Sequence, residues 1–122
     1  MINILLSGCL GRMGQAICAL AADRTDCRIA AGLDCQSDDS GAFPIYADTG
    51  AVQTDYDVLI DFSHPSALSG IAALTAQTGK PVVIATTGLN DSHQALLDVL
   101  SRSAAVFTAA NMSLGEIGRA HV

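Results

Sequence analysis

The sequence predicts an α/β fold, a doubly wound parallel sheet with helices on both faces. Three observations carry this prediction. Strand-like and helix-like segments alternate along the chain. Half of the 122 residues are hydrophobic, yet the chain has only three Phe, two Tyr and no Trp, so its core must be aliphatic, as in a buried parallel sheet. A glycine-rich turn directly follows the first strand-like run and leads into the first helix-like run.

The first third of the chain is expected to form strand, helix and strand. Ile2–Ser7 is a short apolar run that suits a central strand, and residues 8–14 form the glycine-rich turn. A helix ending near Asp23 should follow, because apolar side chains recur at helical spacing at Met13, Ile17, Leu20 and Ala21. Cys27–Leu33 predicts a second strand, closed by Asp34.

The middle of the chain is less regular. Residues 36–41 are polar and predict a loop, whereas 43–56 allow a short strand near Ile45 and a small helical turn. Residues 57–62 predict a strong third strand.

The last part of the chain predicts helix, strand, helix and strand. Ser63 is expected to cap a helix with Pro65 in its first turn, and Gly79 should end that helix. Its inward face is predicted at Leu68, Ile71, Ala72 and Thr75. Strands are predicted at 81–86 and 104–109. Between them Asn90 or Asp91 caps a helix with an inward face at Leu96, Leu97 and Leu100.

The glycine turn has the pattern G-x-x-G-x-x-G, formed by Gly8, Gly11 and Gly14. Glycines allow a tight turn, a close approach of the backbone to a pyrophosphate, and close packing of helix on strand. The N-terminus of the following helix offers free N–H groups to phosphates. Strand, glycine turn and helix together predict a Rossmann-like dinucleotide-binding domain.

Two charged residues belong to this prediction. Asp34 ends the second strand 20 residues after Gly14, where an acidic side chain binds the adenosine ribose hydroxyls and repels a 2′-phosphate. This favours NADH over NADPH; the alternative is that Asp34 only caps a turn. Arg12 opens the helix, where the dipole disfavours a cation unless an anion lies nearby. We therefore favour a phosphate contact for Arg12 over a solvated surface role.

Three further segments follow predicted strands: residues 61–65, 85–88 and 109–115. The carboxyl ends of parallel strands meet at one edge of the sheet, where ligands bind. Hydroxyl, amide and small residues there suit ribose hydroxyls and a carboxamide, although capping and turn roles explain some of them. His64 is assigned a surface or capping role rather than that of a general acid, because no positioned partner is evident.

Composition excludes several other functions. A formal net charge of -6 argues against nucleic acid or anionic membranes as partners. No apolar run is long enough to span a bilayer and no basic leader precedes the first strand, which predicts a cytoplasmic protein. The spacing of the cysteines predicts free thiols in or near the core and no metal site; they are Cys9, Cys18, Cys27 and Cys35.

Five segments together resemble the dihydrodipicolinate reductase family. They are GCLGRMG at 8–14, Asp34, DFSHP at 61–65, ATTG at 85–88 and AANMSLG at 109–115. The resemblance implies an oxidoreductase that uses NAD(P)H to reduce a cyclic dicarboxylate, after loss of water, to tetrahydrodipicolinate in diaminopimelate and lysine biosynthesis. It also implies a homotetramer assembled through a separate substrate domain.

The resemblance also assigns residues. It implies no catalytic residue and no metal ligand in this chain, and cofactor contacts at Gly8, Gly11, Arg12, Met13, Asp34, Phe62, Ala85, Thr86, Thr87, Ala109, Ala110, Asn111 and Met112. Family members with a basic residue after the acidic one tolerate NADPH better. Cys35 stands at that place, which again favours NADH.

The end of the chain departs from the family pattern. We expect residues 1–115 to be the dinucleotide-binding domain, with the substrate domain missing, so that the chain alone has no reductase activity. Residues 116–122 match a translation of a common short-read sequencing adapter and are expected to be a non-native tail.

Two other functions remain open. A lone Rossmann-like domain also suits a non-catalytic NAD-sensing module. It equally suits the cofactor domain of a related dehydrogenase of amino acids or aldehydes, although the combination of five motifs argues against this.

Overall fold

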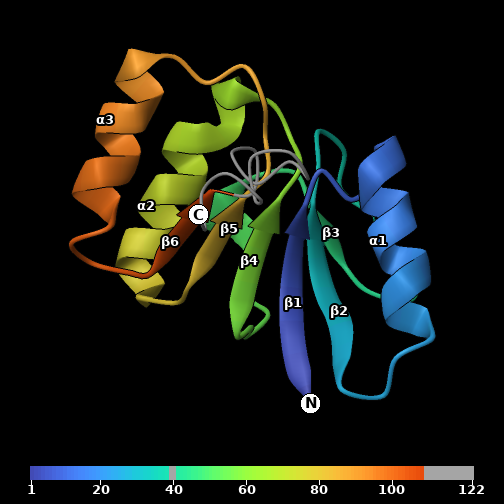
Figure 1. Cartoon of the computed structure of the whole chain (residues 1–122). Coiled ribbons are helices and arrows are strands. Elements are labelled where there is room, and N and C mark those ends of the chain that lie inside the picture. Colours follow the sequence, from blue (N-terminus) through green and yellow to red (C-terminus); the bar gives the residue numbers. More distant parts are fainter. Residues whose placement is uncertain (39–40, 109–122) are drawn as a thin grey trace, which may run out of the picture.

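The computed structural model describes residues 1–38 and 41–108, and within them six parallel strands form one sheet. The spatial order is β3-β2-β1-β4-β5-β6. The chain therefore winds outward from β1 in one direction to β3, then crosses to β4 and continues to β6 (Figure 1). The strands are β1 (Ile2–Ser7), β2 (Cys27–Leu33), β3 (Ile45–Tyr46), β4 (Val58–Asp61), β5 (Val82–Ile84) and β6 (Val106–Thr108).

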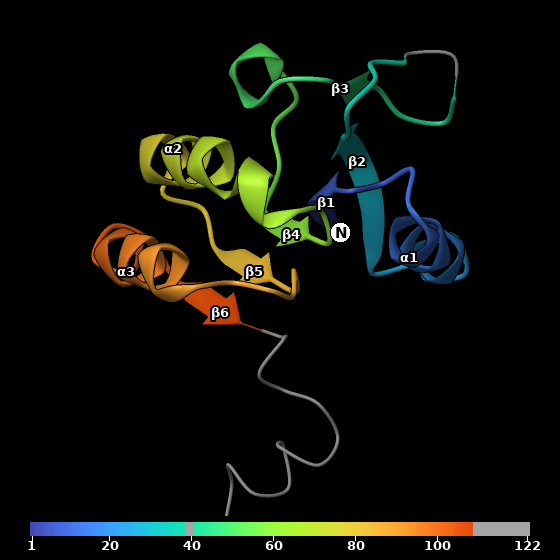
Figure 2. The same cartoon turned by 90° about the horizontal axis from the view of Figure 1, so that it is seen from above.

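Helices cover both faces of the sheet, which confirms the doubly wound fold. Helix α1 (Arg12–Ala22) lies on one face, and α2 (Leu68–Thr78) and α3 (Asp91–Leu100) lie on the other, as the view from above shows (Figure 2). Alternate strand residues supply the two cores. The larger core contains Leu5, Leu59, Val82 and Ile84 beneath α2 and α3. The smaller core contains Ile4, Leu6 and Cys9, with Ile17 of α1 packed against them.

The strands follow the sequence prediction closely. β1 and β2 have the predicted bounds, while β4 and β5 are shorter than the predicted runs by two and three residues, and β6 begins two residues later than predicted. The irregular region 43–56 contains a short strand, β3, and a 3-10 turn, η1 (Thr49–Ala51), as expected. Three predictions concern residues that lie outside the described ones. They are the end of the last strand at residue 109, the cofactor contacts Ala109, Ala110, Asn111 and Met112, and the tail 116–122.

The apolar residues that recur at helical spacing along α1 do not all face the core. Met13 and Leu20 are exposed, with 53% and 65% of their surface accessible. The buried residues of this helix are Gly14 and Ala21. A side chain at Gly14 would place its Cβ 2.1 Å from the carbonyl oxygen of Gly8. The helix therefore approaches the turn through small residues, and this close contact rotates the larger side chains toward solvent.

The helix caps differ from the prediction in detail. Ser63 is not a cap; a 3-10 turn, η2 (Pro65–Ala67), precedes α2, and His64 is its N-cap without a side-chain hydrogen bond. Gly79 ends α2 in the left-handed conformation, at φ 68°, as predicted. For α3 the structure selects Asn90 as the cap. His93 completes a capping box by accepting the Asn90 N–H.

The four cysteines are free thiols, but they differ in exposure. Cys9 is buried, Cys18 and Cys27 are half-buried, and Cys35 is exposed. The prediction that all four lie in or near the core is therefore wrong for Cys35, which follows the carboxyl end of β2. Within residues 1–38 and 41–108, no helix is long and apolar enough to cross a bilayer.

Candidate functional site

The glycine turn between β1 and α1 brings three backbone segments into close contact. Gly8 has φ 83°, and a Cβ there would lie 2.8 Å from the carbonyl carbon and oxygen of Phe62. Neither feature tolerates a side chain. The Gly11 N–H donates to the Gly8 carbonyl at 3.1 Å, which tightens the turn. Gly11 is also the N-cap of α1, and no side chain caps the helix. The first N–H groups of α1 are therefore available to an anion.

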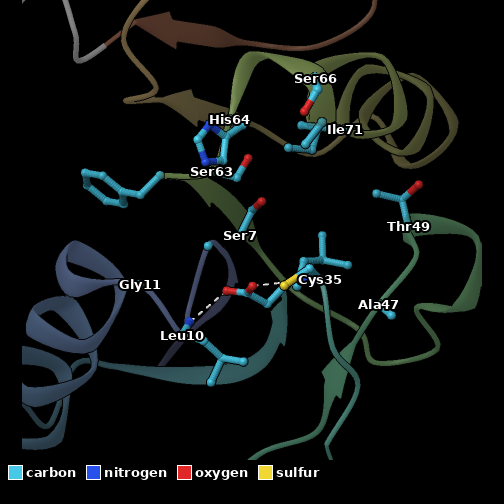
Figure 3. Close-up of a pocket in the computed structure, with 15 residues that line it drawn as sticks. Ser7, Leu10, Gly11, Cys35, Ala47, Thr49, Ser63, His64, Ser66 and Ile71 are labelled. Carbon is cyan, nitrogen blue, oxygen red and sulfur yellow. Dashed lines mark hydrogen bonds between the residues drawn. The ribbon is translucent and has the colours of Figure 1, made fainter.

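Asp34 connects the end of β2 to this turn. One carboxylate oxygen accepts the Leu10 N–H at 2.9 Å and the other accepts the Cys35 N–H at 2.7 Å (Figure 3). Burial raises the pKa of Asp34, but the hydrogen bonds from Cys35 and Leu10 outweigh it, so its pKa lies below the ordinary value. A carboxylate oxygen accepts more than one hydrogen bond. Asp34 is therefore a charged group that retains free acceptor capacity.

A cavity of about 530 Å³ opens beside the glycine turn at the carboxyl edge of the sheet. Four residues predicted as cofactor contacts line it: Gly8, Gly11, Asp34 and Phe62. Figure 3 shows side chains from separate elements converging around it. The remaining wall consists of Ser7, Leu10, Leu33, Cys35, Ala47, Thr49, Ser63, His64, Ser66, Ala67 and Ile71.

Sequence reasoning missed the far wall of this cavity. Ala47 and Thr49 come from the irregular region after β3, and Ser66 and Ala67 come from the 3-10 turn before α2. No local pattern in the sequence indicates that these two regions face each other. His64 also lines the cavity, and its imidazole is exposed rather than engaged in capping.

The other predicted contacts among the described residues are not part of the cavity wall. Arg12 and Met13 are exposed in the first turn of α1. Arg12 forms no hydrogen bond or ion pair with any part of the chain that the structure describes. The segment after β5, the strand next to β4 in the sheet, contains Ala85, Thr86 and Thr87. Thr86 is buried, whereas Thr87 is exposed.

A buried carboxylate lies where β4 ends. Asp61 has no exposed surface, and one of its oxygens accepts hydrogen bonds from both the backbone N–H and the hydroxyl of Ser63. Its other oxygen accepts the Thr86 hydroxyl at 2.7 Å. In the described ranges no basic side chain forms an ion pair with Asp61. Three neutral donors therefore hold the carboxylate, and through it the ends of β4 and β5 are joined.

Cys9 is part of the glycine turn, but its side chain is buried and unsuited to nucleophilic chemistry. Burial, the negative charge of Asp34 and the neighbouring Cys18 raise its pKa to about 11. The thiolate, which is the reactive form, is therefore scarce near neutral pH. Cys9 instead fills space: a Cβ on Gly32 would lie 2.5 Å from its sulfur. No group of three potential metal ligands occurs in residues 1–38 and 41–108.

Comparison with known proteins matches residues 2–112 to the family model "Dihydrodipicolinate reductase, N-terminus". A 4-hydroxy-tetrahydrodipicolinate reductase of Clostridium botulinum is 43% identical over 115 residues, which cover 94% of this chain and 45% of that protein. The chain thus spans about half the length of this relative.

Solved structures support the fold. The dipicolinate-bound dihydrodipicolinate reductase of Paenisporosarcina sp. TG-14 matches with a TM-score of 0.69 and 23% identity, covering 83% of this chain and 43% of that one. A homoserine dehydrogenase of S. aureus gives a TM-score of 0.70 at 17% identity, covering 88% and 32%. At such identities both show the fold alone.

The sequence matches are more specific than the shared fold, because the family model covers nearly all of the chain and the relative carries the same family name. These sequence matches distinguish the chain from other dehydrogenases that have a similar sheet. They indicate a family of reductases, which are oxidoreductases. The chain belongs to the dihydrodipicolinate reductase family and corresponds to its N-terminal part.

Proposed function

We propose that this chain binds a nicotinamide dinucleotide and forms the cofactor-binding part of a 4-hydroxy-tetrahydrodipicolinate reductase. The observation that carries the proposal is the joint placement of the uncapped N-terminus of α1, the glycine turn and the Asp34 carboxylate around one cavity. A dinucleotide requires N–H donors for its phosphates and, close by, a carboxylate acceptor for its ribose hydroxyls.

The topology suggests how the two halves of the cofactor lie. The strand order reverses between β1 and β4, and dinucleotides bind across the crevice at such a switch point. The pyrophosphate would accept hydrogen bonds from N–H groups at the start of α1. The adenosine ribose would donate to Asp34 on the β2 side. The nicotinamide half would then extend over the ends of β4, β5 and β6, on the side where Thr86 and Thr87 lie.

Charge at the adenosine end supports a preference for NADH. In the proposed binding mode a 2′-phosphate would approach the Asp34 carboxylate, and the next residue along the chain is the neutral Cys35. Neither Lys nor Arg is among the residues that line this cavity. A 2′-phosphate would therefore meet an anion without a compensating cation, which costs affinity even at the high effective dielectric of a partly exposed site.

The reaction proposed for the longer protein is reduction of the cyclic dicarboxylate, after loss of water, to tetrahydrodipicolinate. The bound cofactor would supply the hydride. The described residues of this chain hold and orient the dinucleotide, and we assign none of them to proton donation or to binding of the substrate carboxylates. We propose that the second half of the protein supplies those groups and that it also forms the homotetramer. The cytoplasm is the proposed location.

The proposal is tested by fluorescence titration of the 122-residue chain with NADH and with NADPH, repeated with Asp34→Ala. We expect saturable binding of NADH, weaker binding of NADPH, and loss of the preference in the variant. Ser101→Ala is a suitable control, because this exposed hydroxyl donates to the Asp98 carbonyl in the last turn of α3. A wild-type chain without saturable binding of either cofactor, or an unchanged preference in Asp34→Ala, would contradict the proposal.

A further inference from the structure

The buried carboxylate of Asp61 has no role in the proposed cofactor contacts, yet it joins the ends of two strands on which those contacts depend. Asp61 is the last residue of β4, and its backbone carbonyl also accepts the Ala85 N–H at 2.9 Å. Its side chain reaches across the same gap to the Thr86 hydroxyl. Both backbone and side chain of one residue thus fix where the chain goes after β5.

The Thr86 hydroxyl is already committed to this network. Thr86 is 4% exposed, and its hydroxyl oxygen lies 2.7 Å from Asp61 Oδ2 and 3.2 Å from the Ser63 carbonyl oxygen, so the carboxylate is the nearer acceptor. A hydroxyl has one hydrogen to donate. The side chain of Thr86 therefore acts inward, away from the exposed surface, which Thr87 and Gly88 present instead.

The network also reaches the glycine turn. Ser63 is bonded to Asp61 through both its N–H and its hydroxyl, and the preceding carbonyl group, that of Phe62, lies against Gly8. The turn that is proposed to hold the pyrophosphate and the loop after β5 are therefore linked through a single buried carboxylate. Removal of one donor would leave a buried charged oxygen short of a partner, which is costly.

We propose that Asp61, Ser63 and Thr86 form a positioning network that presets the loop after β5 for the nicotinamide half of the cofactor, and that the Thr86 side chain acts through Asp61 rather than by touching the cofactor. This inference rests on the proposed function. Its physical basis is preorganisation: a loop held in its binding geometry loses less entropy when the ligand binds. The network holds Thr87 in a fixed position relative to Phe62 and Ser63.

The test compares Thr86→Val, which removes the hydroxyl at nearly constant shape, with Thr86→Ser, which keeps it. Affinities for NADH and for ADP are measured by calorimetry on the 122-residue chain. ADP carries only the adenosine and pyrophosphate half. We expect Thr86→Val to weaken NADH by about fivefold or more while changing ADP by less than about twofold, and Thr86→Ser to retain most of the NADH affinity.

Thr75→Val is the matched control. Thr75 is also a buried threonine, but it does not itself line the cavity, and its hydroxyl donates to the Ile71 carbonyl inside α2. The same substitution there should leave both affinities unchanged, although it lowers stability. If Thr86→Val does not fold, Ser63→Ala replaces it, because Asp61 then keeps the Ser63 N–H and the Thr86 hydroxyl. We expect a smaller loss for NADH, again with little change for ADP.

Three outcomes would overturn the positioning role. They are unchanged NADH affinity in Thr86→Val, an equal loss for NADH and ADP, and a loss in Thr86→Ser as large as that in Thr86→Val. The third result would mean that the threonine methyl group, rather than the hydroxyl, matters. A wild-type chain that binds neither NADH nor ADP is a different result: it refutes the proposed function itself and removes the basis of this assignment.

Discussion

Asp34→Asn should change both the stability of the glycine turn and the choice of cofactor. The amide keeps the shape of the carboxylate but has only one acceptor oxygen. Asp34 now accepts the Leu10 N–H at 2.9 Å and the Cys35 N–H at 2.7 Å. In the variant an NH₂ group faces one of these donors, so that a hydrogen bond becomes a contact between two donors.

The size of the effect on stability follows from that lost bond. An unpaired buried donor costs about 1–3 kcal/mol, and because Asp34 is only half-buried we take the lower end, about 1 kcal/mol. For a domain of this length, such a loss lowers the melting temperature by about 4 °C. Urea unfolding at neutral pH, followed by circular dichroism, measures the loss of free energy of unfolding. The exposed Asp98→Asn in α3 is the control and should unfold at the wild-type midpoint.

The pH dependence has a defined sign. The folded pKa of Asp34 lies below its ordinary value of 3.8, because its hydrogen bonds from Cys35 and Leu10 outweigh burial. A group with a lowered folded pKa contributes stability that is fully present above the unfolded value and is lost as the pH falls through the folded value. The difference between wild type and Asp34→Asn should therefore be largest near pH 7 and shrink below about pH 4.

The cofactor preference should change in the same variant. Loss of one carboxylate acceptor for the ribose should weaken NADH about tenfold, since a hydrogen bond to a charged group contributes roughly 1.5–3 kcal/mol. NADPH should not weaken as much, because the repulsion between its 2′-phosphate and the carboxylate disappears. If Asp34→Asn unfolds at the wild-type urea midpoint at pH 7 and keeps the wild-type ratio of affinities, the account of Asp34 is wrong.

Two further predictions concern the glycines and the cysteines. Gly14→Ala should lower the free energy of unfolding by about 3 kcal/mol, because its Cβ would lie 2.1 Å from the Gly8 carbonyl oxygen. Gly11→Ala, whose Cβ would meet that oxygen at 3.4 Å, should fold as well as wild type yet bind NADH more weakly; equal urea midpoints for the two variants would refute this contrast. In alkylation at pH 8 followed by mass spectrometry, exposed Cys35 should react first and be protected by NADH. Buried Cys9, with a pKa of about 11, should react only on unfolding, and a faster reaction at Cys9 would contradict the burial described here.

The sequence was sufficient to predict the sheet, because each strand is an apolar run bounded by turn residues. β1 and β2 have the predicted bounds for this reason. The helix faces were harder. Apolar residues at helical spacing in α1 include Met13 and Leu20, but the helix packs through Gly14 and Ala21, and small residues carry little weight in a pattern of hydrophobic side chains.

The site was predictable only where function depends on local sequence. Gly8, Gly11 and Asp34 follow a pattern of short-range spacing, and they lie around one cavity. Ser63 was expected to cap a helix, but the neighbouring carboxylate of Asp61 accepts its hydroxyl instead. The wall formed by Thr49 depends on tertiary contacts between η1 and α2 that no local pattern encodes.

The central claim is that the glycine turn and Asp34 hold a dinucleotide. A titration of the ¹⁵N-labelled chain with NADH, followed by amide chemical shifts, tests it most directly. The account predicts saturable shifts concentrated at the N–H groups of Leu10, Gly11, Arg12 and Cys35, with little change in α3. Shifts that do not saturate, or that cluster away from the turn and from Asp34, would contradict it.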